Sequence, residues 1–280
     1  MGAETIRDLE ELTAGRRAIL RSVVADLERS HQLLAKSDYS SSAAQTFNAA
    51  FASAAAVGIR ATKAARDLID IGWEPEAYVL VRVVVDASHG LGFMLSVPAS
   101  ERLAIAEKFE AMIWLRAPEL MELIENEPER FPPEKVEMMK TLHQKFGDPK
   151  SLDRRQHWSG LDRGTFISKA IAEIERLLGE GAEGLARSIK TREYDQLGST
   201  LVHADAAAQF FMPHTEDGRS VRIQPTPDDP PLFLSSLLEV AAVLLFLVSR
   251  RSGFGEDGRR IKAHARDYFF EILELHKRHY

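Results

Sequence analysis

The sequence PEAYVLVRVVVDASHGLGFML, from Pro75 to Leu95, decides how this chain folds. It is apolar on nearly every side of a helix, and a helix of that kind is normally buried in a core. Arg82, Asp86 and His89 nevertheless occur within it at positions i, i+4 and i+7, which fall on one helix face. Because burying a charge is costly unless the charge is paired, this polar stripe needs partners. We expect a buried core helix that carries a candidate site.

Two interpretations of the polar stripe stay open. In the structural one, Arg82 and Asp86 form an ion pair within the helix, and His89 is hydrogen-bonded at its edge. In the functional one, the stripe faces a polar pocket between helices, where sites are commonly built. Asp86 would then be a base or a metal ligand, and Arg82 would bind an anion.

The composition predicts an ordinary globular protein. The 280 residues carry a formal net charge of −6 with 28% charged side chains, which argues against general nucleic-acid binding. There is no Cys, so disulfides, thiolate metal sites and a Cys nucleophile are excluded. The charged first residues match neither a signal peptide nor a myristoylation motif, so we expect a cytoplasmic protein. The sequence leaves cofactor, metal, ligand and partner unknown, and a homodimer is an open alternative.

A second apolar stretch, Leu232 to Ser249, has the length and the flanking charges of a minimal membrane span. Glu239 lies near its middle, where a carboxylate would cost about 2.5–3.5 kcal/mol on insertion. No other segment is expected to qualify as a span. We therefore expect a buried core helix here and no membrane association.

Apolar residues recur at helical spacing along most of the chain, which predicts an all-α, multi-helix bundle of about eight to ten helices. Residues 147–160 lack this periodicity and predict a long central loop, the only plausible subdivision of a single helical domain, 1–280. Asp217 and Gly218 predict a turn with at most one short β-ribbon around it. The expected helices lie near residues 9–34, 47–68, 75–95, 98–126 (divided at Pro118), 133–146, 165–178, 184–212, 232–250 and 259–279.

The stretch from Arg192 to Met212 holds a second group of candidate residues. Arg192, Ser199 and His203 share one face of the predicted helix, and Tyr194 is a binding candidate on the opposite, apolar face. Ser199 and His203, four residues apart, have the spacing of a nucleophile and its base. No orienting acid or oxyanion-hole motif accompanies them, so a structural His203 is the favoured interpretation.

The loop DRRQHWSG, from Asp153 to Gly160, is the third candidate place. Its arginines together with His157 and Trp158 suit contacts to phosphate or stacking on a base. The favoured interpretation is structural, with Trp158 docking the loop on the helices and Arg163 solvated.

Metal binding is a further hypothesis. Asp86, His89 and His203 would together have a two-His-one-carboxylate composition, provided that their two helices face each other. The sequence has no H-E-x-x-H motif, no P-loop, no dinucleotide-binding fingerprint and no kinase signature.

Three motifs, in order, carry a resemblance to a known family. They are A-x-x-L-x-R-x-x-x-(D/E) at Ala77 to Asp86, H-W-S-G at His157 to Gly160, and Y-x-x-x-x-S-x-x-V-H at Tyr194 to His203. In this order they resemble a bacterial all-helical family known only as a domain of unknown function, over roughly residues 45 to 250. The resemblance implies an all-helical fold and a role in bacterial stress or phage defence.

The S-x-x-V-H motif is also distantly similar to HEPN domains. Their ribonuclease members carry an Arg four to six residues before the His. Here the nearest upstream Arg is Arg192, with ten residues between it and His203. This departure weakens the expectation of ribonuclease activity.

The sequence thus predicts a soluble helical binding or regulatory module. The alternative is a HEPN-like nuclease or a metal-assisted hydrolase that uses His203 and Asp86. In either case we expect Arg82, Asp86, Ser199 and His203, with Trp158, to surround one polar pocket.

Overall fold

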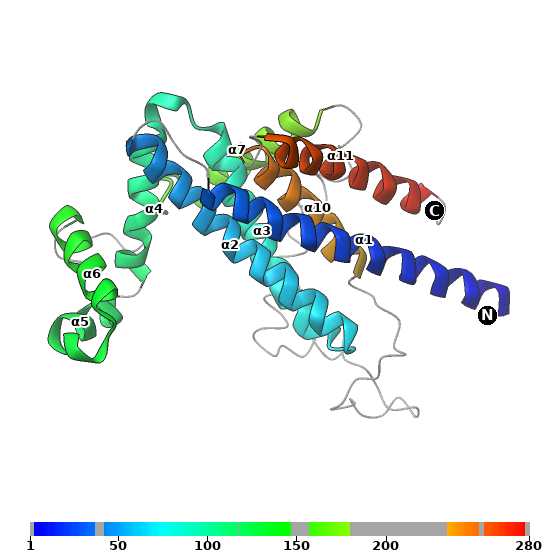
Figure 1. Ribbon diagram of the computed structural model, residues 1–280, viewed down its shortest axis with the longest axis horizontal. Helices are drawn as coiled ribbons and strands as arrows, with labels where there is room; N and C mark the ends of the chain where they lie inside the picture. Colours follow the sequence, from blue (N-terminus) through cyan, green and yellow to red (C-terminus); the bar gives the residue numbers. More distant parts are fainter. Residues whose placement is uncertain are drawn as a thin grey trace.

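The computed structural model describes residues 3–36, 42–116, 118–146, 157–179, 234–251 and 255–277 (Figure 1). These ranges contain nine α-helices, two short 3-10 helices and no strand, so the described part of the chain is all-α. The helices are α1 (Ala3–Lys36), α2 (Ser42–Asp70), α3 (Glu74–Ser96), α4 (Arg102–Arg116), α5 (Pro118–Asn126), α6 (Pro133–Phe146), α7 (Arg163–Leu178), α10 (Leu234–Ser249) and α11 (Gly255–Lys277). The predicted β-ribbon near Asp217, the helix near 184–212 and the first part of the central loop lie outside the described residues.

Glycine, proline and acidic residues set several of the helix ends. Gly72, at φ 85°, forms the turn between α2 and α3, and Pro75 lies in the first turn of α3, where its missing N–H costs nothing. Helix α6 spans Pro133–Phe146 as predicted. Helix α11 begins at Gly255, four residues earlier than predicted, because Glu256 and Asp257 supply an acidic first turn that favours the helix N-terminus.

Helices α3 and α10 form the centre of the fold. Helix α3 packs against α2, α7 and α10, and α10 packs in addition against α1, α2 and α11. In Figure 1 the long helices α1, α2 and α11 lie on the outside of this pair. One apolar cluster, with members from Leu20 to Ile272, joins both halves of the chain.

The two apolar segments behave as core helices. Helix α10 spans 16 residues, 12 of them buried, so the expectation of a core helix at this place is confirmed. The expectation that no other segment could qualify as a span was wrong, because Glu76–Ser96 of α3 is long and apolar enough by length and composition. Much of that helix is buried against α2, α7 and α10, as a central helix of a globular core would be.

Glycines allow α3 to approach its neighbours closely. A Cβ added at Gly92 would lie 3.0 Å from the Ala170 carbonyl oxygen of α7 and 2.9 Å from Ile174 Cγ1. A Cβ at Gly58 of α2 would lie 2.9 Å from Ala87 Cβ of α3. These distances are shorter than van der Waals contact, so the small residues fix the spacing of α2, α3 and α7.

Helices α5 and α6 form an extension at the end of α4, away from the long helices (Figure 1). They have a small apolar cluster of their own around Ile124 and Met139. Lys145 Nζ of α6 lies 3.0 Å from Glu110 Oε2 and 3.6 Å from Glu107 Oε1, both of α4. These contacts tie the extension back to α4.

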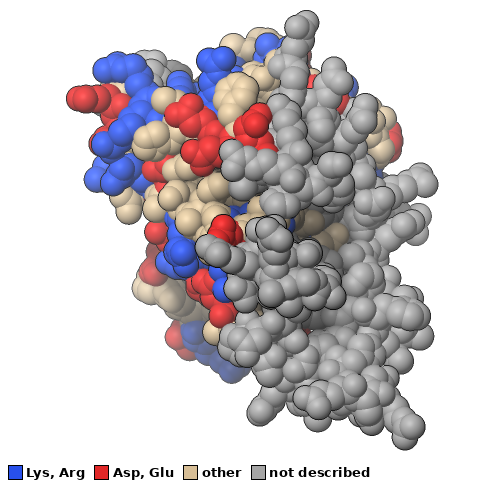
Figure 2. All heavy atoms as spheres, turned by 90° about the vertical axis from the view of Figure 1, so that its right-hand side faces the viewer, with Lys and Arg blue, Asp and Glu red and all other residues tan. Residues whose placement is uncertain are grey.

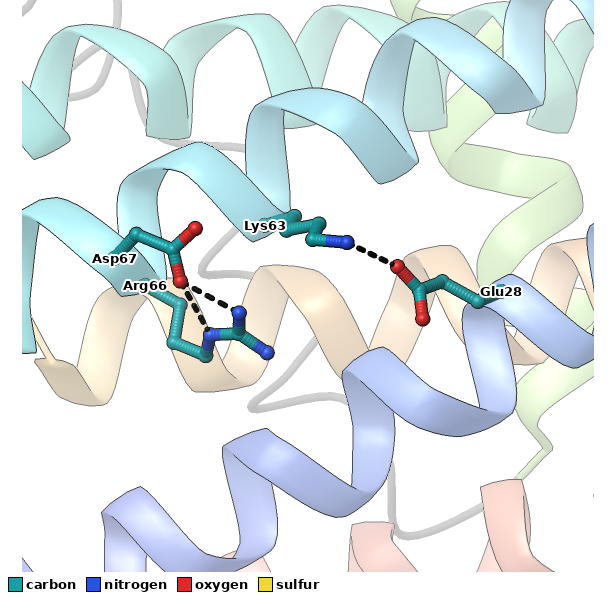
Figure 3. A network of polar contacts seen from close by, with 4 residues as sticks. All are labelled: Glu28, Lys63, Arg66 and Asp67. Carbon is teal, nitrogen blue, oxygen red and sulfur yellow. Dashed lines mark hydrogen bonds and ion pairs between the residues drawn. The ribbon is translucent and has the colours of Figure 1, made fainter.

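The outer faces of α1 and α2 carry surface ion pairs (Figure 3). Lys63 Nζ lies 2.8 Å from Glu28 Oε1 and links the two helices, and Arg66 pairs with its neighbour Asp67. Both side chains of the Lys63–Glu28 pair are about half exposed, so it contributes at most about 1 kcal/mol. Among the described residues on the face seen in Figure 2, acidic and basic side chains are interspersed.

A polar network around the buried Asp26 side chain joins α11 to α1. The Asp26 side chain of α1 is buried, and its Oδ2 lies 2.9 Å from His264 Nδ1 and accepts a hydrogen bond from the Tyr268 hydroxyl at 3.1 Å. Burial, and next the Asp26 carboxylate, raise the pKa of Tyr268 to about 12, because both disfavour a phenolate. No sequence pattern points to this network, because Asp26 lies more than 200 residues before His264 and Tyr268.

Two substitutions on α3 test the packing of this helix. Gly92→Ala should lower the free energy of unfolding by about 1–3 kcal/mol, because the added methyl overlaps α7. Gly90→Ala should raise it by up to about 1 kcal/mol, because Ala is the better helix former and its Cβ meets only Trp158 Cζ2, at 4.0 Å. Denaturant unfolding measures both. If both substitutions changed the free energy of unfolding equally, the close contact between α3 and α7 at Gly92 would be contradicted.

The Tyr268 contact predicts a loss of stability at alkaline pH. The pKa of Tyr268 is raised in the folded state, so its protonated hydroxyl stabilises the fold at pH values below its ordinary pKa of about 10. This stabilisation is lost as the pH rises toward about 12. From about pH 9 to about pH 11, wild type should therefore lose up to about 1 kcal/mol more unfolding free energy than Tyr268→Phe. Parallel urea titrations measure the difference. Identical pH profiles of the two proteins would contradict the prediction.

Candidate functional site

The polar stripe of α3 borders a pocket of about 490 Å³, which we call the α3–α7 pocket. Such a volume is within the range of small-molecule sites. Its described lining comes from five elements: Ala54 and Val57 of α2; Arg82, Val83, Asp86, Ala87 and Gly90 of α3; Phe109 of α4; His157 and Trp158 of the turn before α7; and Arg163, Phe166 and Ile167 of α7.

The stripe is less buried than the sequence predicted. His89 is buried, but Arg82 is half-buried and Asp86 is exposed, so the expectation that the core helix buries the charges of the stripe was wrong for Asp86. The physical reason is that α2 and α7 cover the two sides of α3 and leave the strip from Arg82 to Gly90 open to the pocket. Arg82 and Asp86 line this pocket, and His89 does not.

A tight turn brings the H-W-S-G motif to the pocket. The Gly160 N–H donates to the His157 carbonyl oxygen at 2.8 Å, and Gly160 has φ +74°, which a residue with a side chain rarely adopts. The turn leads directly into α7 and places His157 and Trp158 beside α3. The motif therefore positions two of the candidate residues.

Hydrogen bonds within the turn fix the tautomer of His157. The Ser159 backbone N–H donates to His157 Nδ1 at 3.2 Å. Ser159 Oγ accepts the Leu161 N–H at 3.2 Å and lies 2.7 Å from Nδ1. Nδ1 is thus an acceptor, so the neutral imidazole carries its proton on Nε2. His157 contributes a hydrogen-bond donor to its surroundings, not an acceptor.

Aromatic side chains form the inner wall of the pocket. Trp158 is 7% exposed, and its ring makes edge contacts with Phe93, Phe109 and Phe166 at centroid distances of 5.6, 5.2 and 5.6 Å. Such pairs contribute about 0.5–1.5 kcal/mol each beyond burial. Trp158 therefore docks the turn on the helices, as predicted, and also lines the pocket.

Asp162 sets the start of α7 and with it the place of Arg163. Its carboxylate accepts hydrogen bonds from the Thr165 backbone N–H at 2.9 Å and from the Thr165 hydroxyl at 2.6 Å. These bonds hold the pKa of Asp162 below its ordinary value. Arg163 is the first residue of the capped helix, and it is exposed and lines the pocket.

The remaining candidates lie elsewhere or outside the described residues. Arg192, Tyr194, Ser199 and His203 are outside the described ranges, so their predicted places in the pocket stay predictions. Within the described ranges, no group of three His, Asp or Glu side chains could hold a metal ion.

Sequence reasoning missed several lining residues. Phe109 and Phe166 reach the pocket from helices whose neighbours in space the sequence did not reveal. Arg163 was expected to be merely solvated; the one available signal was the Asp162 cap, with Thr165 three residues later, which fixes the helix start.

No protein-family model matches this chain, and no curated protein or solved structure matches it. The resemblance to the bacterial all-helical family and to HEPN domains stays a prediction.

Replacing Trp158 tests whether the turn depends on it. Trp158→Ala should lower the free energy of unfolding by about 3–5 kcal/mol, because a large buried ring is removed. Trp73→Ala is the matched control, since Trp73 is 37% exposed and its loss should cost less than about 1 kcal/mol. Chemical denaturation followed by circular dichroism measures both. A Trp158→Ala variant as stable as the control would mean that the turn is not anchored by this ring.

Proposed function

We propose that this chain is a small-molecule-binding module and that the α3–α7 pocket is its binding site. The observation that carries the proposal is the pocket itself: a cavity of about 490 Å³ that combines aromatic and aliphatic walls with four polar side chains from three elements. Pockets of small molecules have this make-up, in which apolar walls supply affinity and a few polar groups fix orientation.

The rigidity of the walls supports the proposal. The α3 wall is locked between α2 and α7 by Gly58 and Gly92, and the turn wall is held by the Trp158 contacts. A preformed cavity loses little conformational entropy when a ligand enters it. The pocket therefore suits binding without a large rearrangement.

The enzyme alternative predicted from the sequence needs Asp86 and His203 to meet. Asp86 lies at the pocket, and His203 is outside the described residues. A HEPN-like nuclease or a metal-assisted hydrolase stays a prediction, and the binding proposal does not depend on it.

A variant that fills the pocket tests the proposal. Gly90 lines the pocket, and a Cβ there would meet only Trp158 Cζ2, at 4.0 Å. The side chain of Gly90→Leu should therefore enter the cavity, while Gly90→Ala should leave most of it empty. A fragment library is screened by ligand-observed NMR against wild type. We expect compounds that bind wild type and Gly90→Ala but lose at least about tenfold in affinity for Gly90→Leu.

Two outcomes would overturn the proposal. One is a screen with no binder to folded wild type. The other is a set of binders whose affinities Gly90→Leu does not change although it remains folded by circular dichroism.

A further inference from the structure

Helices α1 and α11 run antiparallel, side by side (Figure 1), and a buried carboxylate lies between them. The Asp26 side chain of α1 is buried, and its Oδ2 lies 2.9 Å from Nδ1 of His264 on α11. The His264 side chain itself is 41% exposed. The imidazole is thus held from the protein side at Nδ1, and Nε2, on the far side of the ring, points toward solvent.

The same carboxylate fixes which nitrogen of the His264 ring carries the proton. An ionised carboxylate only accepts hydrogen bonds, so Nδ1 donates to Asp26, and Nε2 of the neutral ring keeps its lone pair. Tyr268 contributes to the arrangement, because its hydroxyl donates to the same Asp26 oxygen at 3.1 Å and its ring lies 6.2 Å from the His264 ring. The lone pair of Nε2 is therefore oriented before any reagent arrives.

The other described histidines differ from His264 in these respects. His89 is buried, and the turn before α7 makes Nδ1 of His157 an acceptor, so that its proton is on Nε2. Nδ1 of His143 on α6 also lies 2.8 Å from a carboxylate, that of Glu125, but this carboxylate is 39% exposed. Among the residues that the structure describes, His264 alone combines an exposed imidazole with a carboxylate buried behind it.

We propose that His264 is a phosphoryl-acceptor site, with Nε2 as the nucleophile and a phosphoramidate as the class of donor. Histidine is one of the side chains that form covalent intermediates as nucleophiles. A buried carboxylate at Nδ1 stabilises the positive charge that the ring gains when Nε2 forms a bond. Phosphoryl transfer passes through a loose transition state, for which a protein mainly supplies position and charge. The open position of the ring also leaves the charged oxygens of the product in water.

The transfer balances without a further reagent. The Nε2 lone pair attacks phosphorus, the bond between Nε2 and phosphorus forms, and the P–N bond of the phosphoramidate breaks. Ammonia leaves with the electron pair of that bond. Nδ1 keeps its proton and its hydrogen bond, so the phosphorylated ring is cationic and faces the Asp26 carboxylate. Asp26 does not touch the phosphoryl group and is a positioning residue.

Reaction of the protein with potassium phosphoramidate tests the site. Phosphate at each histidine is followed over time by mass spectrometry of peptides kept at alkaline pH. His264 should be phosphorylated at least about tenfold faster than His31 or His143, because neither of these has a buried carboxylate behind its ring. Phosphorus NMR should place the phosphate on Nε2 of His264. Nitrogen NMR of the unmodified imidazole should show its proton on Nδ1.

Two carboxylate variants separate orientation of the ring from charge near it. Asp26→Asn keeps the shape of the side chain, but its amide can donate to Nδ1, so the tautomer is no longer fixed. Asp267→Asn removes an exposed carboxylate of α11 three residues from His264. Phosphorylation at His264 should slow by at least about tenfold in Asp26→Asn and by less than about twofold in Asp267→Asn. The rates at His31 and His143 should stay at their wild-type values, and circular dichroism checks that both variants are folded.

Several results would overturn the site. They are the absence of phosphate on His264, a rate at His264 no higher than at His31 or His143, and a folded Asp26→Asn protein that keeps the wild-type rate. If Asp26→Asn does not fold, the wild-type rates and the imidazole proton decide alone, and a neutral ring with its proton on Nε2 contradicts the proposed nucleophile. None of these results bears on the α3–α7 pocket, because neither Asp26 nor His264 lines it.

Discussion

The structure depends on how closely α3 can approach its neighbours. At Gly92 the α3 backbone lies against the Ala170 carbonyl and Ile174 of α7, and at Ala87 it meets Gly58 of α2. Small residues at these crossings let apolar side chains on both sides interdigitate, which is where most burial energy is gained. Helix α10, packed against α3, then completes the core. The positions of the α2, α3 and α7 walls of the pocket follow from these crossings.

This packing also explains how charge is tolerated on a core helix. Arg82 and Asp86 occupy a face of α3 that α2 and α7 flank but do not cover, so the two side chains keep contact with water. Desolvation, which would cost several kcal/mol per buried ion, is largely avoided. The charged side chains of an otherwise apolar helix are accommodated because this face of α3 borders the pocket.

The turn before α7 performs two tasks with few residues. Its tryptophan anchors it among aromatic rings, and its serine orients the histidine beside it. Because the anchor and the oriented group are adjacent in sequence, the position of His157 depends on the packing of Trp158. Disturbing the aromatic wall should therefore disturb the polar groups of the pocket as well. In the proposed binding site, the stability of the fold is therefore coupled to ligand recognition.

The sequence alone determined the helical class, the ends of α3 and α6, and the common face of Arg82 and Asp86, because helical periodicity, Gly and Pro act locally. It also singled out His157 and Trp158 by their residue types. Only the tertiary structure decided that Asp86 is exposed, that Phe109 and Phe166 complete the pocket, and that Asp26 meets Tyr268. These features depend on which helices pack together, and that choice is made by the summed burial of side chains distant in sequence, which no local pattern records.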